Sequence, residues 1–154
     1  MTRPEITQEL SERLEKKINP NNDTRIYYAK EVTFDYAADA KRVDFVLFKP
    51  QNNSIGGIEK GDFYCYEIKS SVEDFKSKNG HNMLGDFNYY VMPEDVFTAV
   101  KEQVPWSVGV LCPDRFSLKT VKNARRVSRN RATSEMLLMM FRSANRENIK
   151  RRRT

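Results

Sequence analysis

The chain has 154 residues, of which 39% are hydrophobic and 11% aromatic, which suffices for the core of one domain and excludes a largely disordered protein. No apolar run reaches the roughly 18 residues of a membrane helix, and the first residues lack the apolar segment of a secretory signal. We therefore expect a soluble protein of a reducing compartment, without a membrane partner, in which Cys65 and Cys112 are buried free thiols.

Charge is distributed unevenly along the chain. Residues 1–114 carry 14 basic and 19 acidic side chains, whereas residues 115–154 carry 13 basic and two acidic ones. This segregation predicts a polyanionic partner, and nucleic acid is the obvious candidate, although a solubilising tail is the alternative. The side chains expected to contact phosphates without reading sequence are Arg125, Arg126, Arg129, Arg131, Lys150, Arg151, Arg152 and Arg153.

The first half of the chain predicts one helix followed by three strands. Apolar residues recur every four positions over residues 4–18, and Pro4 suits the first turn of a helix there. Runs of β-forming residues predict strands over 25–34, 42–48 and 63–70, with a turn at 35–40. Residues 51–62 contain Gly56-Gly57 and predict a hairpin loop.

The second half alternates between helices and strands. In order, we expect a short helix over 72–78 with Ser71 as its cap, a loop over 79–88, a strand over 89–92, a helix over 93–103, a buried strand over 106–112 that begins at a core Trp106, an edge strand over 117–122, a helix over 133–146, and a frayed basic end over 147–154. The whole pattern is that of an α/β domain with a central mixed sheet flanked by helices.

The strand over 63–70 carries two charges at the end of an apolar run. Because side chains alternate between faces, Glu67 and Lys69 share a face with Phe63 and Cys65, and the other face carries Tyr64, Tyr66 and Ile68. Burying such charges is costly unless they are paired or bind a metal. An ordinary exposed ion pair is the alternative interpretation.

The preceding strand carries a third charged residue. Asp44 is expected to lie opposite an apolar face made of Val43, Phe45 and Leu47. Two neighbouring strands would bring Asp44 and Glu67 close together, and carboxylate oxygens on one wall suit Mg²⁺, which keeps several waters and takes phosphate oxygens as further ligands. A lysine beside them would stabilise charge that develops on a phosphate.

The spacing of Asp44 and Glu67-Ile68-Lys69 resembles the PD-(D/E)xK signature of the restriction-endonuclease-like nucleases. The run EIKSSVEDFKSKNGHNMLGDFNYYVMP is similar to the MmcB-like DNA repair branch, in which the charged strand is followed by Ser, an Asp-Phe pair, a loop and a strand that ends in Pro. The resemblance covers about residues 4–126. It departs from the signature in having Val43 where Pro often precedes the aspartate.

This resemblance implies a restriction-endonuclease-like core in the order α-β-β-β-α-β over residues 1–126, with a basic C-terminal helical extension over residues 127–154 in the same domain or appended to it. It also implies a bacterial or phage-encoded cytoplasmic nuclease that hydrolyses phosphodiester bonds of DNA with Mg²⁺ or Mn²⁺, in DNA repair or phage DNA processing. Asp44, Glu67 and the Ile68 carbonyl would hold the metal, and Lys69 would act on the attacking water. An additional acid is expected from Glu9 on the first helix or from Glu31 on the first strand.

Several alternatives stay open. The chain could be a noncatalytic nucleic-acid-binding or protein-interaction module on a nuclease fold, and nothing in the sequence separates DNA from RNA. The stripe of Met136, Met139 and Met140 predicts either core packing or a homodimer face. We expect Asp74 to cap its helix rather than to contact a metal-bound water, and His81 to be a surface residue rather than a general base.

Overall fold

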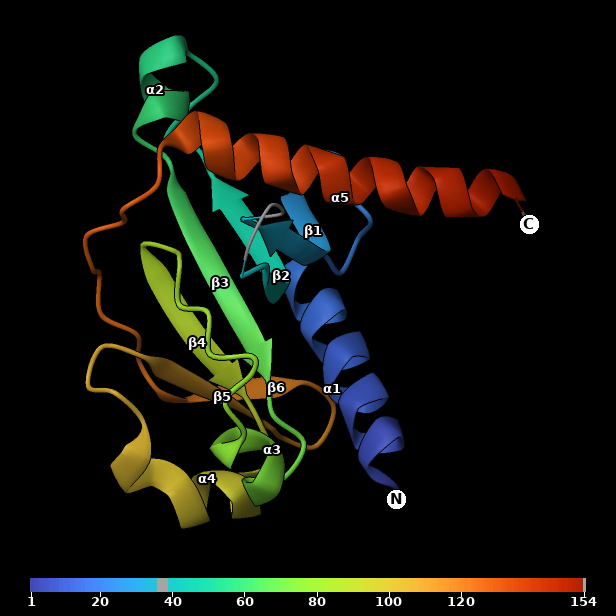
Figure 1. Ribbon diagram of the computed structural model, residues 1–154, viewed down its shortest axis with the longest axis vertical. Helices are drawn as coiled ribbons and strands as arrows, with labels where there is room; N and C mark the ends of the chain where they lie inside the picture. Colours follow the sequence, from blue (N-terminus) through green and yellow to red (C-terminus); the bar gives the residue numbers. More distant parts are fainter. Residues whose placement is uncertain (36–38, 154) are drawn as a thin grey trace.

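The computed structural model describes residues 1–35 and 39–153, so the turn expected at 35–40 lies partly outside the described residues. The elements, drawn in Figure 1, are α1 (Arg3–Ile18), β1 (Tyr27–Phe34), β2 (Lys41–Lys49), α2 (Ile55–Glu59), β3 (Asp62–Ile68), α3 (Val72–Lys76), β4 (Phe87–Val91), α4 (Glu94–Val100) with a 3-10 turn (Lys101–Gln103), β5 (Gly109–Pro113), β6 (Leu118–Lys122) and α5 (Thr133–Arg153).

The strands form one six-stranded mixed sheet in the order β1-β2-β3-β4-β5-β6. The β1–β2 and β2–β3 pairs are antiparallel, the β3–β4 and β4–β5 pairs are parallel, and β6 returns antiparallel to β5. The crossover from β3 to β4 contains α3, and the crossover from β4 to β5 contains α4, as parallel neighbours require. The predicted α/β architecture with a central mixed sheet between helices is therefore confirmed.

Helices cover both faces of this sheet. On one face α1 buries Leu10 and Leu14 against the sheet residues Phe45, Leu47, Tyr66, Ile68, Val91 and Leu111. On the other face α5 packs Met136 and Met140 against β1, β2 and β3, while α3 and α4 pack Phe75, Val96 and Val100 against β4 and β5. Glu67 and Lys69 lie on this second face, between the part covered by α5 and the part covered by α3 and α4. Cys65 and Cys112 are both buried free thiols, as predicted.

Two predictions about secondary structure are wrong. Residues 55–59 form a helix rather than a loop, because the Ser54 hydroxyl caps it by accepting from the Gly57 N–H at 3.0 Å. Gly57 packs against Asn52 so closely that a Cβ would lie 2.0 Å from the Asn52 side chain, so glycine here permits close packing. The last helix also continues to Arg153 instead of fraying after residue 146. Basic residues fill its last turn, where they complement the helix dipole, and Lys150 pairs with Glu147 at 3.6 Å.

Two predictions about burial are also wrong. Trp106 is 75% exposed, since the strand begins only at Gly109. Val43 does not share a face with Phe45 and Leu47, because it packs with Val46 on the α5 side of the sheet. The alternation of β2 is interrupted at Asp44, opposite Glu31, whose φ of 52° also interrupts β1.

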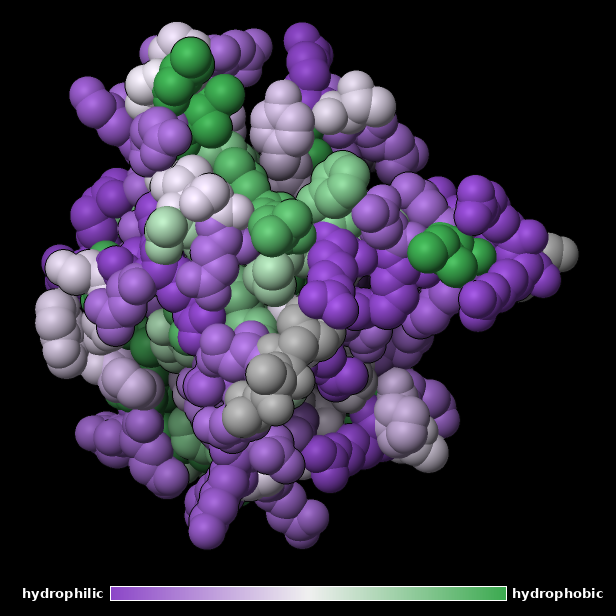
Figure 2. Space-filling view, turned by 45° about the horizontal axis from the view of Figure 1, so that its top comes forward, coloured by the Kyte–Doolittle hydropathy of each residue, from purple (hydrophilic) through white to green (hydrophobic). Residues whose placement is uncertain are grey.

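Some large apolar side chains stay at the surface. Ile55 on α2 and Leu138 and Phe141 on α5 are 82%, 60% and 63% exposed. Figure 2 shows hydrophobic side chains gathered over α2 and toward the start of α5, whereas the far end of α5 is largely hydrophilic. Among the described residues, no helix is long and apolar enough to cross a membrane.

Candidate active site

The candidate site lies where β2 begins and β3 ends, near α1 and α3 (Figure 1). The ladder between the two strands reaches Phe45 and Tyr66, and continuing its register places Asp44 opposite Glu67. Beyond that point side chains replace the main-chain bonds. The Asp44 N–H donates to Glu67 Oε1 at 3.1 Å, and the Ile68 N–H donates to Asp44 Oδ2 at 2.7 Å. The two carboxylates are therefore interlocked across the strand pair, as the sequence predicts.

Glu67 is the anomalous member of this pair. Its residue is fully buried, with 0% exposure, and its Oε2 atom makes no hydrogen bond of standard geometry among the described residues, although the Asn82 N–H lies near enough to the carboxylate to lower its pKa. Buried polar atoms are nearly always paired, so an unpaired carboxylate oxygen requires an explanation. A divalent cation would pair with this oxygen, because carboxylate oxygens are preferred ligands of hard divalent ions.

Lys69 follows Glu67 on the same face of β3 and is only 2% exposed. Its Nζ donates to the main-chain oxygen of Asn79 at 2.8 Å, in the loop between α3 and β4. A Cβ built on Gly80 would lie 2.7 Å from Lys69 Nζ and 3.2 Å from Glu67 Oε2, so both atoms converge on this glycine. Asp44, Glu67 and Lys69 are thus brought together, as expected.

Burial and mutual repulsion shape the acid–base properties of these groups. Burial is the main cause that raises the pKa of Glu67 to about 8, and the charge of Asp44 adds to it. Burial also raises the pKa of Asp44, although its bond from the Ile68 N–H opposes this shift. Burial lowers the pKa of Lys69 against the opposing charges of Asp74, Glu67 and Asp44. A divalent cation bound between Asp44 and Glu67 would relieve the repulsion between the two carboxylates.

Asp74 acts as a capping residue, as predicted. Its N–H is bound by the hydroxyl of Ser71, and its Oδ2 accepts from the Ser70 N–H at 3.0 Å. The other carboxylate oxygen pairs with Arg3 at 2.8 Å, which ties the start of α1 to α3 beside the site. His81 is held by Tyr90 and by the main chain of Ser77, which fixes its ring in the loop rather than leaving it free in solvent.

The three groups adjoin an open cleft of about 950 Å³. Asp44, Ile68 and Lys69 line its inner part, and α1, the start of β2 and the loop after α3 form its rim. The cationic side chains of the lining are Arg3, Lys41, Arg42, Lys69 and Lys78, against Asp39, Asp44 and Asp74. A second cleft on the other side of Asp44 is lined by the acids Glu12, Glu15, Glu31 and Glu147 together with Lys30 and Arg42.

The two additional acids suggested by the sequence lie in different places. Glu9 pairs with Arg13 at 3.1 Å and lines neither cleft, so it is not brought to the site. Glu31 lines the second cleft together with Asp44. On α1 it is Glu12, rather than Glu9, that lines this cleft. The sequence does not show which side of α1 meets the start of β2, because the apolar stripe defines only the face of the helix that is buried against the sheet.

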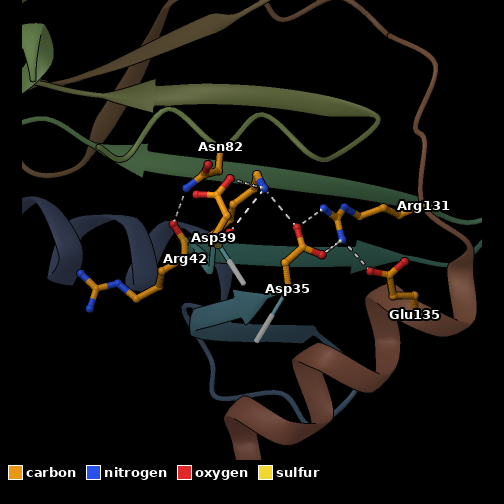
Figure 3. A network of polar contacts seen from close by, with 7 residues as sticks. Asp35, Asp39, Arg42, Asn82, Arg131 and Glu135 are labelled. Carbon is orange, nitrogen blue, oxygen red and sulfur yellow. Dashed lines mark hydrogen bonds and ion pairs between the residues drawn. The ribbon is translucent and has the colours of Figure 1, made fainter. Parts of the chain in front are cut away.

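Three of the four arginines between β6 and α5 make ion pairs within the chain. Arg126 forms two bonds with Asp62, at 2.6 and 2.8 Å, and Arg129 pairs with Asp86 at 3.1 Å. Arg131 bonds Asp35 and Glu135, as Figure 3 shows. These contacts fasten residues 123–132 to the sheet and to the start of α5. They leave Arg125 as the member of the group without an ion pair among the described residues, while Lys150 and the arginines at 151–153 lie on the exposed end of α5.

Two features of the site could not be predicted from the sequence: the gathering of cations at the cleft rim and the contact of Gly80 with Lys69 and Glu67. Arg3, Lys41, Arg42 and Lys78 come from separate segments with no shared pattern, so only the fold reveals that they gather. A partial signal was present, since Lys41 and Arg42 lie within three residues of Asp44 in the sequence. Gly80 in the loop Asn79-Gly80 resembles any turn glycine in the sequence.

Among the described residues, no group of three or more His, Cys, Asp and Glu side chains is arranged to hold a metal ion. The site offers two carboxylates and neighbouring main-chain atoms of Ile68, a set that matches Mg²⁺ with several of its waters retained.

In comparison with known proteins, the fold is similar to that of the SPO1766 protein of unknown function from Silicibacter pomeroyi. The TM-score is 0.55 at 21% identity, over 83% of this chain and 80% of that one. At this identity the similarity concerns the fold alone. No protein-family model and no curated protein matches the chain.

Proposed function

We propose that the protein is a metal-dependent nuclease of the PD-(D/E)xK type that hydrolyses phosphodiester bonds of DNA. The observation that carries this proposal is the buried Glu67, whose Oε2 atom makes no hydrogen bond of standard geometry and whose other oxygen interlocks with Asp44. Burying such a carboxylate costs stability that an apolar residue would not cost. A cation held between the two acids gives this arrangement a function.

The element order supports the same proposal. Helix α1 is followed by three antiparallel strands, then by α3 and a parallel β4, with α2 inserted between β2 and β3. This agrees with the α-β-β-β-α-β order that the resemblance implies, and Asp44 and Glu67 lie opposite each other where the β2–β3 ladder ends.

Each residue then has a defined task. Asp44 and Glu67, with the Ile68 carbonyl as a further ligand, would hold Mg²⁺ or Mn²⁺, which when bound supplies Lewis-acid stabilisation of charge on the phosphate and on the attacking oxygen. Lys69 would orient the attacking water and stabilise negative charge as the bond to phosphorus forms. Asn79 holds the Lys69 ammonium in place, which reduces the entropy lost on reaching the reactive arrangement.

The test is cleavage of a fluorescent panel of single-stranded, duplex and branched DNA and of RNA, with Mg²⁺ and with Mn²⁺. We expect Asp44→Asn, Glu67→Gln and Lys69→Met each to lower the rate by at least about 100-fold, with unchanged circular dichroism. Lys76→Met is the matched control for Lys69→Met, because Lys76 is exposed on α3 outside both clefts.

Metal-dependent cleavage that persists undiminished in all three variants would refute the assignment. Binding of nucleic acid by the wild type without cleavage under either metal would instead identify the noncatalytic binding module. Faster cleavage of RNA than of any DNA would replace the substrate class while keeping the chemistry.

A further inference from the structure

The cationic residues that line the cleft are not equally available to a ligand. Arg3 is bound to Asp74 at 2.8 Å, and Lys41 is bound to Asp35 and Asp39 at 3.1 and 3.4 Å. Lys69 is buried in the site itself. Arg42 and Lys78 differ from these three, because both are exposed at the rim and neither is held by an ion pair closer than 4.0 Å among the described residues.

Arg42 is held only loosely. Its guanidinium lies 4.0 Å from the Glu31 carboxylate, and the two side chains are 61% and 52% exposed, so water screens this pair and it stabilises little. Figure 3 shows its guanidinium pointing away from the network that joins Asp35, Asp39 and Arg131. The side chain of Lys78 makes no ion pair or hydrogen bond within residues 1–35 and 39–153.

The two free cations are nevertheless fixed relative to each other through their backbones. Asn82 donates from its side-chain amide to the main-chain oxygen of Arg42 at 3.0 Å, which joins the loop after α3 to the start of β2 (Figure 3). Lys78 belongs to the same loop, four residues before Asn82. A ligand that bridges Arg42 and Lys78 therefore meets a rim whose backbone is already ordered, which lowers the entropic cost of binding.

The opposite side of Asp44 has the reverse charge. The neighbouring cleft is lined by Glu12, Glu15, Glu31 and Glu147, and only Lys30 and the shared Arg42 oppose them. Glu15 is paired with Lys30 at 3.2 Å and Glu31 lies 4.0 Å from Arg42, so Glu12 and Glu147 are in excess of the cations in this lining. A polyanion is repelled from this side and attracted to the side of Lys78.

We propose that Arg42 and Lys78 form the grip for the phosphate backbone of a nucleic-acid strand, which lies on the Lys78 side of Asp44 and not along the arginine-rich segment at 125–131. This inference rests on the proposed function, since it names how the substrate strand of that site is held. It also assigns the binding role to residues that the charge distribution along the sequence does not single out. Arg126, Arg129 and Arg131 are already paired with carboxylates, whereas Arg42 and Lys78 are available to phosphates.

The test is fluorescence anisotropy with a labelled oligothymidylate of about 20 nucleotides, longer than the site of one small binding domain. Measurement in EDTA prevents metal-dependent cleavage and separates binding from the proposed chemistry. We expect the double variant Arg42→Ala/Lys78→Ala to bind about tenfold more weakly and to lower the slope of log affinity against log salt by about 1.4, the value for two lost phosphate contacts on a single strand.

The matched control is Lys76→Ala/Arg115→Ala, which removes the same charge from two exposed positions outside the clefts and is expected to change affinity less than about twofold. An equal loss in both double variants, an unchanged affinity in Arg42→Ala/Lys78→Ala, or no binding by the wild type would each overturn the proposal. Because no metal is present, absence of cleavage in the nuclease assay does not affect this result, and the two proposals fail separately.

Discussion

At the scale of single residues, Glu67 links the stability of the protein to pH. The pKa of its carboxyl is raised from 4.5 to about 8, mainly by burial and also by Asp44, so the folded chain holds this proton more tightly than the unfolded chain does. Linkage then requires that the contribution of Glu67 to stability is full below pH 4.5 and is lost as the pH rises through 8.

Replacing Glu67 with Gln removes this titration while keeping the shape of the side chain. Both proteins are measured without metal. We expect the melting temperature of Glu67→Gln minus that of the wild type to increase steadily between pH 4.5 and 8 and to level off above pH 8. The total change should be several degrees, since about 1 kcal/mol shifts a domain of this size by roughly 2–4 °C. Differential scanning calorimetry at five or six pH values measures it, and a flat difference would show that Glu67 keeps an ordinary pKa.

Gly80 makes a second prediction at this scale. Its φ is 73°, and a Cβ there would press on Lys69 Nζ at 2.7 Å. Gly80→Ala is therefore expected to cost about 1–2 kcal/mol of unfolding free energy and to displace the ammonium from the site. Urea unfolding and the cleavage rate measure the two effects.

The control for this substitution is Gly56→Ala. A Cβ on Gly56 would meet nothing within 4 Å, and the residue lies in α2, so the change should be neutral or stabilising by up to about 1 kcal/mol. Equal unfolding free energies and equal cleavage rates in the two variants would contradict the placement of Gly80 against Lys69.

At the scale of elements, the segment between β6 and α5 is held by side-chain ion pairs together with two main-chain bonds, from Arg125 to Ser107 and from Val127 to Asp86. Arg129 lies over the ring of Phe63 and pairs with Asp86, and both charged side chains are largely buried, at 13% and 12% exposure. Asp86 also accepts from the Phe63 N–H at 2.8 Å. Removing the guanidinium leaves the buried Asp86 carboxylate with one of these two hydrogen bonds, the one from the Phe63 N–H.

We therefore expect Arg129→Ala to lower the free energy of unfolding by about 2–4 kcal/mol. Arg125→Ala, four residues earlier and exposed, should change it by less than about 0.5 kcal/mol. Equilibrium unfolding in urea compares the two variants directly. If both substitutions cost the same small amount, Arg129 does not anchor this segment.

The sequence predicts most elements because their hydrophobic periods are strong. The apolar stripe of α1 and the β-forming runs of β2 and β3 identify those elements without tertiary information. Hydrophobic periodicity does not predict features that depend on one specific contact or on where a strand begins. Helix α2 depends on the Ser54 cap, and Trp106 is exposed because the chain enters β5 only at Gly109.

The candidate site follows a similar division. Charged residues in the apolar runs of β2 and β3 indicate Asp44, Glu67 and Lys69, because a charge in such a place is rare. The register that places Asp44 opposite Glu67 depends on how the two strands pair. The interruption of side-chain alternation at Asp44 depends on tertiary structure and cannot be predicted from the alternation of residues in the sequence. The rim residues Arg42 and Lys78 lie far apart in the chain and are recognised only once the loop after α3 is seen to contact β2.

At the scale of the whole molecule, charge along the chain and charge in space differ. The C-terminal segment is strongly basic, yet Arg126, Arg129 and Arg131 neutralise Asp62, Asp86 and Asp35 from the otherwise acidic first part. These three arginines therefore do not add to one basic patch, although the chain as a whole carries a net charge of +6. The binding of a nucleic-acid strand that we propose therefore depends on a few cations beside Asp44 and Glu67 rather than on the total charge.

The central claim is that Asp44 and Glu67 share one divalent cation. Crystals soaked in Mn²⁺ test it most directly, because the anomalous signal of manganese locates the ion without reference to activity. We expect one Mn²⁺ between the two carboxylates of the wild type and none at that position in Glu67→Gln. An empty position in the wild type at saturating Mn²⁺, with Glu67 still buried and unpaired, would contradict it.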